Sequence, residues 1–214
     1  MTSAVAGPRL GVLVSGRGTN LEAILQASAE GRLGAVPVLV LSDRAGAPAL
    51  EKAAARGVPA EVVPRSAFAT PESFEAALVH RLRQGGVDLV ALAGFLRVLG
   101  PTFLSAFPGR VLNIHPSLLP SFPGLNAPRQ ALAYGVKVTG CTVHFVDEQV
   151  DHGPIILQAA VPVLAGDTEE SLAARILAEE HRLFPEAIRL VAEGRVRVEG
   201  RVVLAEGGGR DGRA

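Results

Sequence analysis

Residues 10–25 have the sequence LGVLVSGRGTNLEAIL, and this stretch decides the fold class. Its apolar start, Leu10–Val14, predicts a short buried strand. A turn with two glycines follows, and Thr19–Ala29 has the spacing of an amphipathic helix. A strand that leads through a tight turn into a helix is typical of a βαβ unit, in which parallel strands alternate with helices.

The same alternation continues along the chain. Further strands are predicted over Val36–Leu41, Ala60–Val63, Val87–Leu92 and Arg110–Ile114, and further helices over Pro48–Arg56, Pro71–Gln84 and Pro101–Phe107. Each of these helices begins at a proline, whose missing N–H costs little in the first turn. We therefore predict an α/β, Rossmann-like fold with a mostly parallel sheet flanked by helices on both faces.

The pattern changes after Ile114. Four prolines between positions 116 and 128 predict a long rigid loop. An antiparallel C-terminal portion of two strands, a helix and a hairpin is then expected over Val136–Val146, Pro154–Val163, 168–192 and 195–204. Loops at the carboxyl edge of a parallel sheet commonly bind ligands, so we expect a site beside the proline-rich loop.

Composition limits the classes of protein. The 214 residues, 48% apolar, predict a single domain over residues 1–204 and a disordered tail over residues 205–214. Lys plus Arg equals Asp plus Glu at 21 each, so no overall charge attracts nucleic acid. The apolar runs are far shorter than the roughly 20 residues that span a bilayer, and Met1–Pro8 lacks the basic start of a signal peptide.

Cysteine content indicates the compartment. Cys141 is the only cysteine, which excludes an intramolecular disulfide and suits a reducing cytoplasm. A free cysteine in mid-strand is expected to be a small buried hydrophobe rather than a nucleophile. A cytoplasmic protein with neither a membrane nor a nucleic-acid partner is predicted.

The turn after the first strand is a candidate phosphate cradle. Glycines at positions 16 and 18 let the backbone approach a ligand closely. The first N–H groups and the dipole of the following helix favour an anion there.

Two alternatives for this turn remain open. It could be a plain strand-to-helix turn capped by the side chain of Thr19 or Asn20. It could also bind a dinucleotide, with Asp43 as the ribose ligand. That fingerprint is incomplete, because its third glycine would fall at Leu21.

Asn113 and His115 flank Ile114 at the end of the fifth predicted strand. Because strand side chains alternate, both polar groups face one side while Ile114 faces the core, and Pro116 keeps His115 extended. The amide can donate to an oxyanion, and the imidazole, with an ordinary pKa of ~6.5, can carry a proton. Asp151 is the candidate carboxylate to support it. The alternative is that His115 only anchors the loop that follows it and that Asp151 only forms a turn.

Separated motifs then match a family. Asn113-Ile-His-Pro-Ser-Leu-Leu-Pro120 and Asp151-x-Gly-Pro-Ile resemble the signature of the folate-dependent formyltransferases. Ser15-Gly-x-Gly-x-Asn-Leu21 and Ala93-Gly-Phe-Leu-Arg-Val98 are similar to the branch that formylates glycinamide ribonucleotide in purine biosynthesis. The resemblance covers roughly residues 9–204. It implies an enzyme that uses 10-formyltetrahydrofolate as cosubstrate and transfers its formyl group to the amine of that ribonucleotide.

The resemblance also implies roles for residues. It makes Asn113, His115 and Asp151 catalytic, with the histidine shuttling a proton from the attacking nitrogen to the departing folate nitrogen. It places the ribonucleotide against Gly18, Thr19, Asn20 and Glu180. It places the folate against Leu96, Arg97, Val98, Leu99, Asn113, Asp147, Glu148, Gln149, Val150 and Asp151. For the side chains of Arg97 and Glu180, an ordinary exposed charge is the alternative.

Two positions depart from some relatives. Those relatives have an arginine at Pro71 and a polar residue at Leu177, so the contacts made there are not carried over. The other histidines, at positions 80, 144, 152 and 181, lack the spacing of a zinc site, and no metal is expected. The expected partners are the two small molecules, and the expected assembly is a monomer or a homodimer.

Three other functions are alternatives. Methionyl-tRNA formyltransferases share the Ser-Leu-Leu-Pro loop but add a C-terminal domain, and formyltetrahydrofolate deformylases share the Asn-x-His motif but add an N-terminal one. We expect neither addition, because the predicted elements run from Leu10 to Leu204 and fill the chain. A non-enzymatic nucleotide-binding module would need only the glycine turn.

Overall fold

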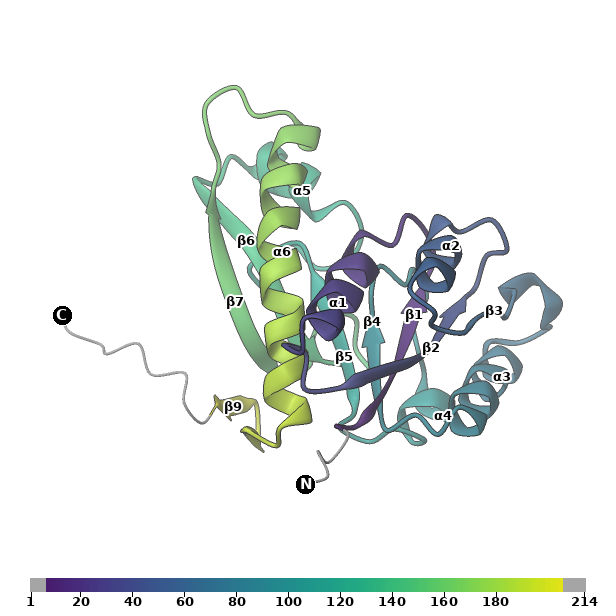
Figure 1. Ribbon diagram of the computed structural model, residues 1–214. Coiled ribbons are helices and arrows are strands. Elements are labelled where there is room, and N and C mark those ends of the chain that lie inside the picture. The colour runs from purple at the N-terminus through teal and green to yellow at the C-terminus, as the bar shows by residue number, and fades with distance from the viewer. Residues whose placement is uncertain (1–6, 206–214) are drawn as a thin grey trace.

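The computed structural model describes residues 7–205, which form a nine-stranded sheet with helices packed on it (Figure 1). The strands are β1 Arg9–Val14, β2 Val36–Ser42, β3 Ala60–Val62, β4 Leu89–Leu92, β5 Val111–His115, β6 Val138–Phe145, β7 Ile155–Pro162, β8 Val196–Glu199 and β9 Val202–Ala205. The helices are α1 Thr19–Ala29, α2 Pro48–Ala55, α3 Pro71–Gln84, α4 Pro101–Leu104, α5 Ala127–Tyr134 and α6 Glu169–Ala192, and Arg65–Ala67 forms a short 3-10 helix.

The strands are ordered β3-β2-β1-β4-β5-β6-β7-β9-β8. Strands β1 to β5 pair in parallel, whereas β6 is antiparallel to both β5 and β7. The predicted α/β fold, mostly parallel with an antiparallel C-terminal portion, is confirmed. Between β1 and β4 the strand order reverses direction, which is the point where open parallel sheets bind ligands.

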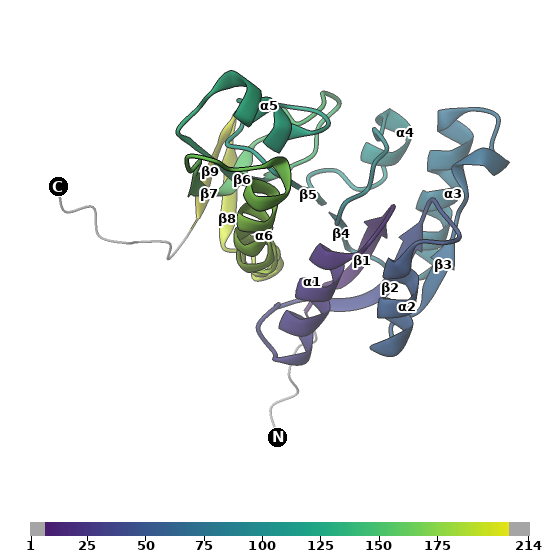
Figure 2. The same cartoon turned by 90° about the horizontal axis from the view of Figure 1, so that it is seen from above.

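Alternate residues of the central strands enter two separate cores. Leu10 and Val12 of β1 pack in a cluster with residues of α1 and α6, whereas Leu13 packs in a second cluster with residues of α3 and α4. Figure 2 shows α1 and α6 on one side of the sheet and α3 and α4 on the other. Burial on both faces explains why β1 is a continuous apolar run.

The segment after β5 differs from the prediction. The prolines predicted a loop, but Ala127–Tyr134 forms the helix α5. Pro128 lies in its first turn, where no N–H is needed, and Gly135 ends it in a left-handed conformation. Pro128 does not break a helix here, because it occupies the same kind of position as the prolines that begin α2, α3 and α4.

The helix α4 is shorter than predicted and ends at Leu104. Its start is capped from α3, because the buried carboxylate of Glu75 accepts from the N–H of Gly100 at 2.8 Å and of Phe103 at 3.1 Å. These bonds fix the end of the segment that leaves β4. Of the predicted tail, Ala205 belongs to β9 and residues 206–214 lie outside the described residues.

Candidate active site

The turn after β1 is tied to the segment after β4. The N–H of Ser15 donates to the carbonyl of Gly94 at 3.1 Å, and its hydroxyl accepts from the N–H of Leu96 at 2.9 Å. Gly18 has a φ of 68°, and a Cβ there would lie 2.6 Å from the Cβ of Ala49. The second glycine of the turn is therefore required both by its conformation and by the close approach of α2.

The helix α1 begins without a side-chain cap. Its cap residue is Gly18, and no side chain of the described residues accepts from its first N–H groups. Asn20 instead donates from Nδ2 to Oε2 of Glu180 at 2.8 Å. A turn capped by Thr19 or Asn20 is thus excluded, and the first N–H groups, at the positive end of the helix dipole, remain for an anion.

Glu180 extends from α6 to the start of α1. It is 6% exposed, so the alternative of an exposed helix carboxylate is wrong. Burial raises the pKa of its carboxyl group, and the hydrogen bond from Asn20 opposes this only in part. Asn20 Oδ1 is buried without a hydrogen-bond partner in the described part of the chain. Acceptor oxygens therefore gather beside the uncapped helix end, where a ligand hydroxyl can donate.

The segment after β4 combines exposed and buried side chains. Leu96 and Val98 are exposed by 54% and 69%, whereas Leu99 is 3% exposed and lies in the core. Arg97 donates from Nε to Oδ2 of Asp43 at 2.7 Å, which makes Arg97 more than a plain surface charge. The Asp43 side chain is fully buried and so does not offer a carboxylate to a ribose, against the dinucleotide alternative.

The ends of β5 and of the β6–β7 loop bring three polar side chains together. Nδ1 of His115 lies 3.2 Å from Oδ2 of Asp151, and Nδ2 of Asn113 lies 3.4 Å from its Oδ1. Ile114 packs in the core, as the alternation predicted. Two residues of β5 and one of the β6–β7 loop thus form one cluster, in which the His115 side chain is only 6% exposed.

Both ring nitrogens of His115 face acceptors. Nε2 lies 2.8 Å from the carbonyl of Phe122, so it must carry a proton. Nδ1 faces the carboxylate of Asp151, so both contacts are satisfied only when the ring is doubly protonated. Burial nevertheless lowers the pKa of His115, against the opposing effects of Asp151 and the Phe122 carbonyl, and His144 adds to the lowering. The ring therefore releases a proton more readily than an exposed histidine does.

Asp151 stays ionised despite its burial. Burial raises the pKa of its carboxyl group, but contacts with His144, the N–H of Gly124 at 2.7 Å and His115 outweigh this and lower it. Its backbone has a φ of 51°, in the left-handed region that side chains seldom adopt. The aspartate is therefore the anionic partner in this cluster.

The comparisons with known proteins agree with one another. A family model described as formyl transferase matches residues 8–188. The chain is 42% identical to the phosphoribosylglycinamide formyltransferase of Escherichia coli, over 92% of this chain and 92% of that protein. The crystal structure of glycinamide ribonucleotide transformylase 1 from Symbiobacterium toebii is 58% identical, with a TM-score of 0.94 over 96% of this chain and 97% of that one.

The chain belongs to the formyl transferase family. Within it, the chain is related to the phosphoribosylglycinamide formyltransferases, which confirms the resemblance drawn from its motifs. The chain also matches the trifunctional purine biosynthetic protein adenosine-3 of Gallus gallus at 48% identity. That match covers 89% of this chain but only 19% of the chicken protein, so the chain spans about a fifth of that relative.

Sequence reasoning missed two groups at the centre of this formyl transferase. His144 lies opposite Asn113 in the antiparallel β5–β6 pair, and its Nε2 is 3.2 Å from Asn113 Nδ2. Its Nδ1 lies 2.7 Å from the Phe145 carbonyl and so donates, while its Nε2 also lies 3.8 Å from Oδ1 of Asp151. The alternation of polar Thr142 and His144 with apolar neighbours was the available signal.

The second missed group is the backbone of the proline-rich loop. The carbonyl of Phe122 and the N–H of Gly124 bind His115 and Asp151, respectively. No side-chain motif reveals such contacts, because only the path of the loop determines them. Cys141, in contrast, behaves as predicted: it is buried, and burial raises its pKa to about 12.

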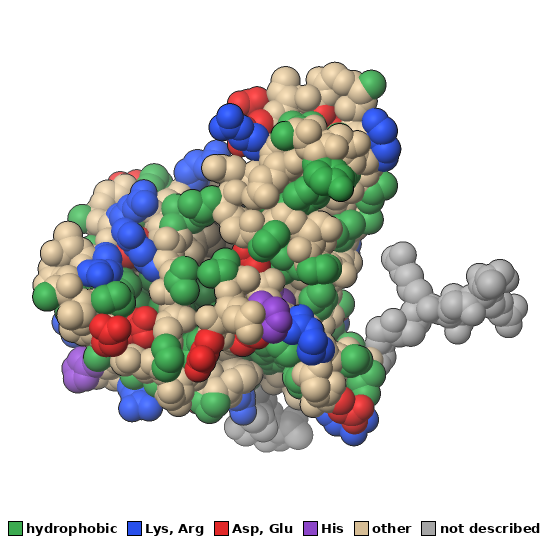
Figure 3. All heavy atoms as spheres, turned by 180° about the vertical axis from the view of Figure 1, so that it is seen from behind, with side chains coloured by type: hydrophobic (Ala, Val, Ile, Leu, Met, Phe, Trp, Pro, Cys, Tyr) green, Lys and Arg blue, Asp and Glu red, His purple; other side chains and the backbone are tan. Residues whose placement is uncertain are grey.

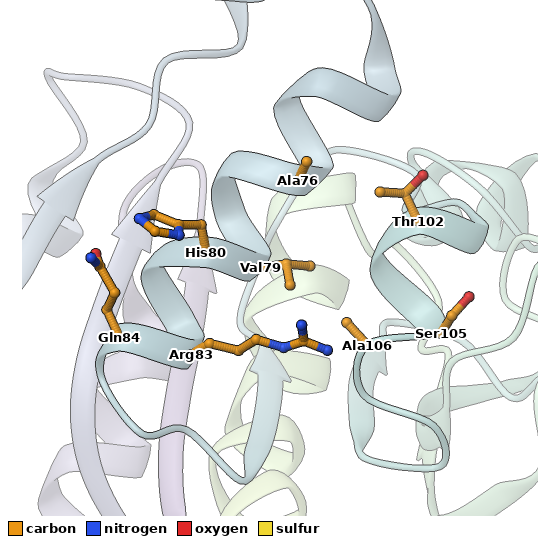
Figure 4. Close-up of a pocket in the computed structure, with 8 residues that line it drawn as sticks. All are labelled: Ala76, Val79, His80, Arg83, Gln84, Thr102, Ser105 and Ala106. Carbon is orange, nitrogen blue, oxygen red and sulfur yellow. The ribbon is translucent and has the colours of Figure 1, made fainter.

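The surface of the described part of the chain is hollowed in more than one place. Figure 3 shows hydrophobic side chains gathered around a hollow in the middle of the face behind that of Figure 1. An open hollow of about 640 Å³ lies between α3 and α4, where Arg83 extends toward Ala106 (Figure 4). Its lining includes none of the predicted site residues.

Two features are absent from residues 7–205. No cluster of three or more His, Cys, Asp or Glu side chains there could hold a metal ion. No helix there is both long enough and apolar enough to cross a membrane.

Proposed function

We propose that this chain transfers the formyl group of 10-formyltetrahydrofolate to the amine of glycinamide ribonucleotide, with Asn113, His115 and Asp151 as the catalytic residues. The observation that carries the proposal is the 3.2 Å contact between His115 and Asp151 beside Asn113. It supplies an oriented proton carrier and an amide donor at one point. Family membership and the uncapped glycine turn support the same reaction.

The chemistry requires one bond to form and one to break. The neutral amine of the ribonucleotide attacks the formyl carbon, and the carbonyl oxygen becomes an oxyanion. Collapse of this intermediate breaks the bond between the formyl carbon and the folate nitrogen. The amine loses a proton and the folate nitrogen gains one, so a group that both takes up and releases a proton serves the whole reaction.

His115 and Asn113 divide this work. Burial lowers the pKa of His115 and so favours the neutral ring, whereas the charge of Asp151 favours the protonated ring. The Nε2 proton now bound to Phe122 becomes available once a substrate displaces that carbonyl. Asn113 makes a long 3.4 Å contact with Asp151, and the developing oxyanion replaces it as the acceptor.

The two substrates occupy separate ends of the site. We infer that the phosphate of the ribonucleotide lies against Gly18, Thr19 and Asn20, with Glu180 nearby as an acceptor for a hydroxyl. The folate lies between the segment Leu96–Leu99 and the loop 147–151, with its flat ring against exposed apolar side chains. These assignments follow the family resemblance, and the exposure of Leu96, Val98 and Val150 supports the folate assignment.

The wider biology follows from this reaction. We infer a cytoplasmic enzyme of purine biosynthesis whose partners are its two small-molecule substrates, working as a monomer or a homodimer. The absence of a bulk charge in the sequence fits a small phosphorylated acceptor better than an RNA.

A formyl-transfer assay with several acceptors tests the proposal. The purified chain is mixed with 10-formyltetrahydrofolate and, in parallel, with glycinamide ribonucleotide, with initiator methionyl-tRNA or with no acceptor. Formylated product and folate consumption are both measured. We expect both only with the ribonucleotide. Equal folate consumption with and without it would identify a hydrolase, and formylated tRNA would identify the other transferase.

A further inference from the structure

The turn between β8 and β9 contacts the loop that carries Asp151. Arg201 donates from Nη2 to the carbonyl of His152 at 2.6 Å, and its Nη1 lies 2.9 Å from Nε2 of the same residue. These contacts join segments 49 positions apart in the sequence. They end on the residue that directly follows Asp151.

The contact with Arg201 determines which nitrogen of the His152 ring carries the proton. A guanidinium only donates, so Nε2 of His152 accepts from Arg201 and its Nδ1 carries the proton. Nδ1 lies 2.7 Å from Oδ2 of Asp147 and donates to it, while Oδ1 of Asp147 accepts from the N–H of Gln149 at 3.0 Å. Asp147 thus links Gln149 and His152 within the β6–β7 loop, and Arg201 binds this loop to the β8–β9 hairpin.

A hold of this kind is needed because Asp151 is strained. Its φ of 51° lies in the left-handed region, which is unfavourable for a residue other than glycine. Such a conformation persists only where its surroundings enforce it. The N–H of Gly124 and His115 contact the Asp151 side chain, and Arg201 holds the residue that follows it.

Gly153 limits how the loop can relax. A Cβ at Gly153 would lie 1.9 Å from the carbonyl of Phe145, so the chain after His152 passes directly against β6. Ile155 then pairs with Val202, next to Arg201 in the sequence, in the β7–β9 pair. The β7–β9 pairing therefore fixes the position of the hairpin relative to the loop, and Arg201 lies directly before the paired residue.

We propose that Arg201 is a positioning residue for the formyl transfer, which holds the carboxylate of Asp151 against His115 by binding the backbone and ring of His152. This inference rests on the proposed function. The pair is exposed, with the His152 side chain 42% accessible, so charge attraction alone contributes little. The two-point geometry on one residue is what restricts the loop.

The first test is Arg201→Ala, with Arg197→Ala on the same hairpin as the matched control. Arg197 pairs only with Glu199 among the described residues, on the exposed hairpin. We expect Arg201→Ala to lower kcat by about tenfold or more, because small misplacements of catalytic groups are costly. The KM for the ribonucleotide should stay unchanged, and Arg197→Ala should change neither quantity. Arg201→Lys, which keeps one donor and the charge, should restore part of kcat.

A second readout needs no substrate. The titration of His115, followed by NMR of its ring, reports on the charges that face it, Asp151 and His144. Because Asp151 raises the pKa of His115, its displacement in Arg201→Ala should move the titration to lower pH. Unchanged kcat and unchanged titration in Arg201→Ala would overturn the inference, as would equal changes in Arg197→Ala. If the wild-type chain formylates no ribonucleotide, the proposed function fails while the titration still tests Arg201.

Discussion

The parallel half of the sheet and its antiparallel half differ in which residues adopt left-handed backbone conformations. In residues 7–115 every described residue with a positive φ is a glycine, as at Gly18 and Gly94. Between β5 and β7 three other residues have one, Phe122, Asn126 and Asp151. Two of these three bear on His115, through the Phe122 carbonyl and the Asp151 carboxylate.

On the proposed function, this difference corresponds to a division between binding and chemistry. The glycine turn of the parallel half achieves its shape without strain and offers backbone N–H groups to an anion. The antiparallel half holds strained residues around a buried histidine, and such strain concentrates where groups must be preorganised. We therefore expect variants in the first region to change affinity and variants in the second to change turnover.

The largest expected effect is in the second region. His115→Ala and Asp151→Asn should each lower kcat by about a hundredfold or more, the scale of a lost proton-transfer group. The affinity for glycinamide ribonucleotide, measured by calorimetry, should change little. His80→Ala, on an exposed position of α3, is the control. Near-normal turnover in both variants would remove these residues from the reaction.

The next effect is in the glycine turn. Gly18→Ala should weaken ribonucleotide binding by about tenfold, because a left-handed conformation costs a side-chain residue roughly 1–2 kcal/mol and the new Cβ meets Ala49. Gly46→Ala is a matched control, since no atom lies within 4 Å of its added Cβ and the residue lies outside the turn. Equal losses of affinity in the two variants would contradict a specific role for Gly18.

A smaller effect concerns the support of the segment Leu96–Leu99, the proposed folate site. Glu75→Gln places an N–H group against the backbone donors of Gly100 and Phe103, and we expect the free energy of unfolding to fall by about 1–3 kcal/mol. Denaturant unfolding measures this, with Glu51→Gln on the exposed side of α2 as control. An unchanged unfolding free energy would show that α4 does not depend on this cap.

The smallest effect is a pH dependence of stability. Burial lowers the pKa of both His115 and His181 from 6.5, so below that pH the folded protein binds fewer protons than the unfolded chain. The free energy of unfolding should therefore fall as pH is lowered through this range. His115→Gln and His181→Gln should each make that slope shallower, and only the first should lower kcat. If neither variant changes the slope, groups other than His115 and His181 cause the pH dependence of stability.

The sequence predicted the parallel half more fully than the antiparallel half. Short-range patterns determine β1, its glycine turn and α1, because alternation and helix periodicity are local. The partner of Asn113 in the next strand depends on register, so His144 was missed. Pro128 was misjudged, since a proline can begin a helix as well as end one.

Long-range contacts explain the remaining gap. The contact of His115 with the Phe122 carbonyl depends on the path of a loop, and the contact of Arg201 with His152 depends on a hairpin at the far end of the chain. Family motifs marked Asp151, but its left-handed backbone is visible only in the fold.

One measurement tests the separation of binding from chemistry most directly. The single-turnover rate of formyl transfer is followed at increasing ribonucleotide concentration for Gly18→Ala and for His115→Ala. We predict that Gly18→Ala approaches the wild-type rate at saturation, whereas His115→Ala remains slow at every concentration. A slow rate at saturation in Gly18→Ala, or recovery of His115→Ala by excess ribonucleotide, would contradict it.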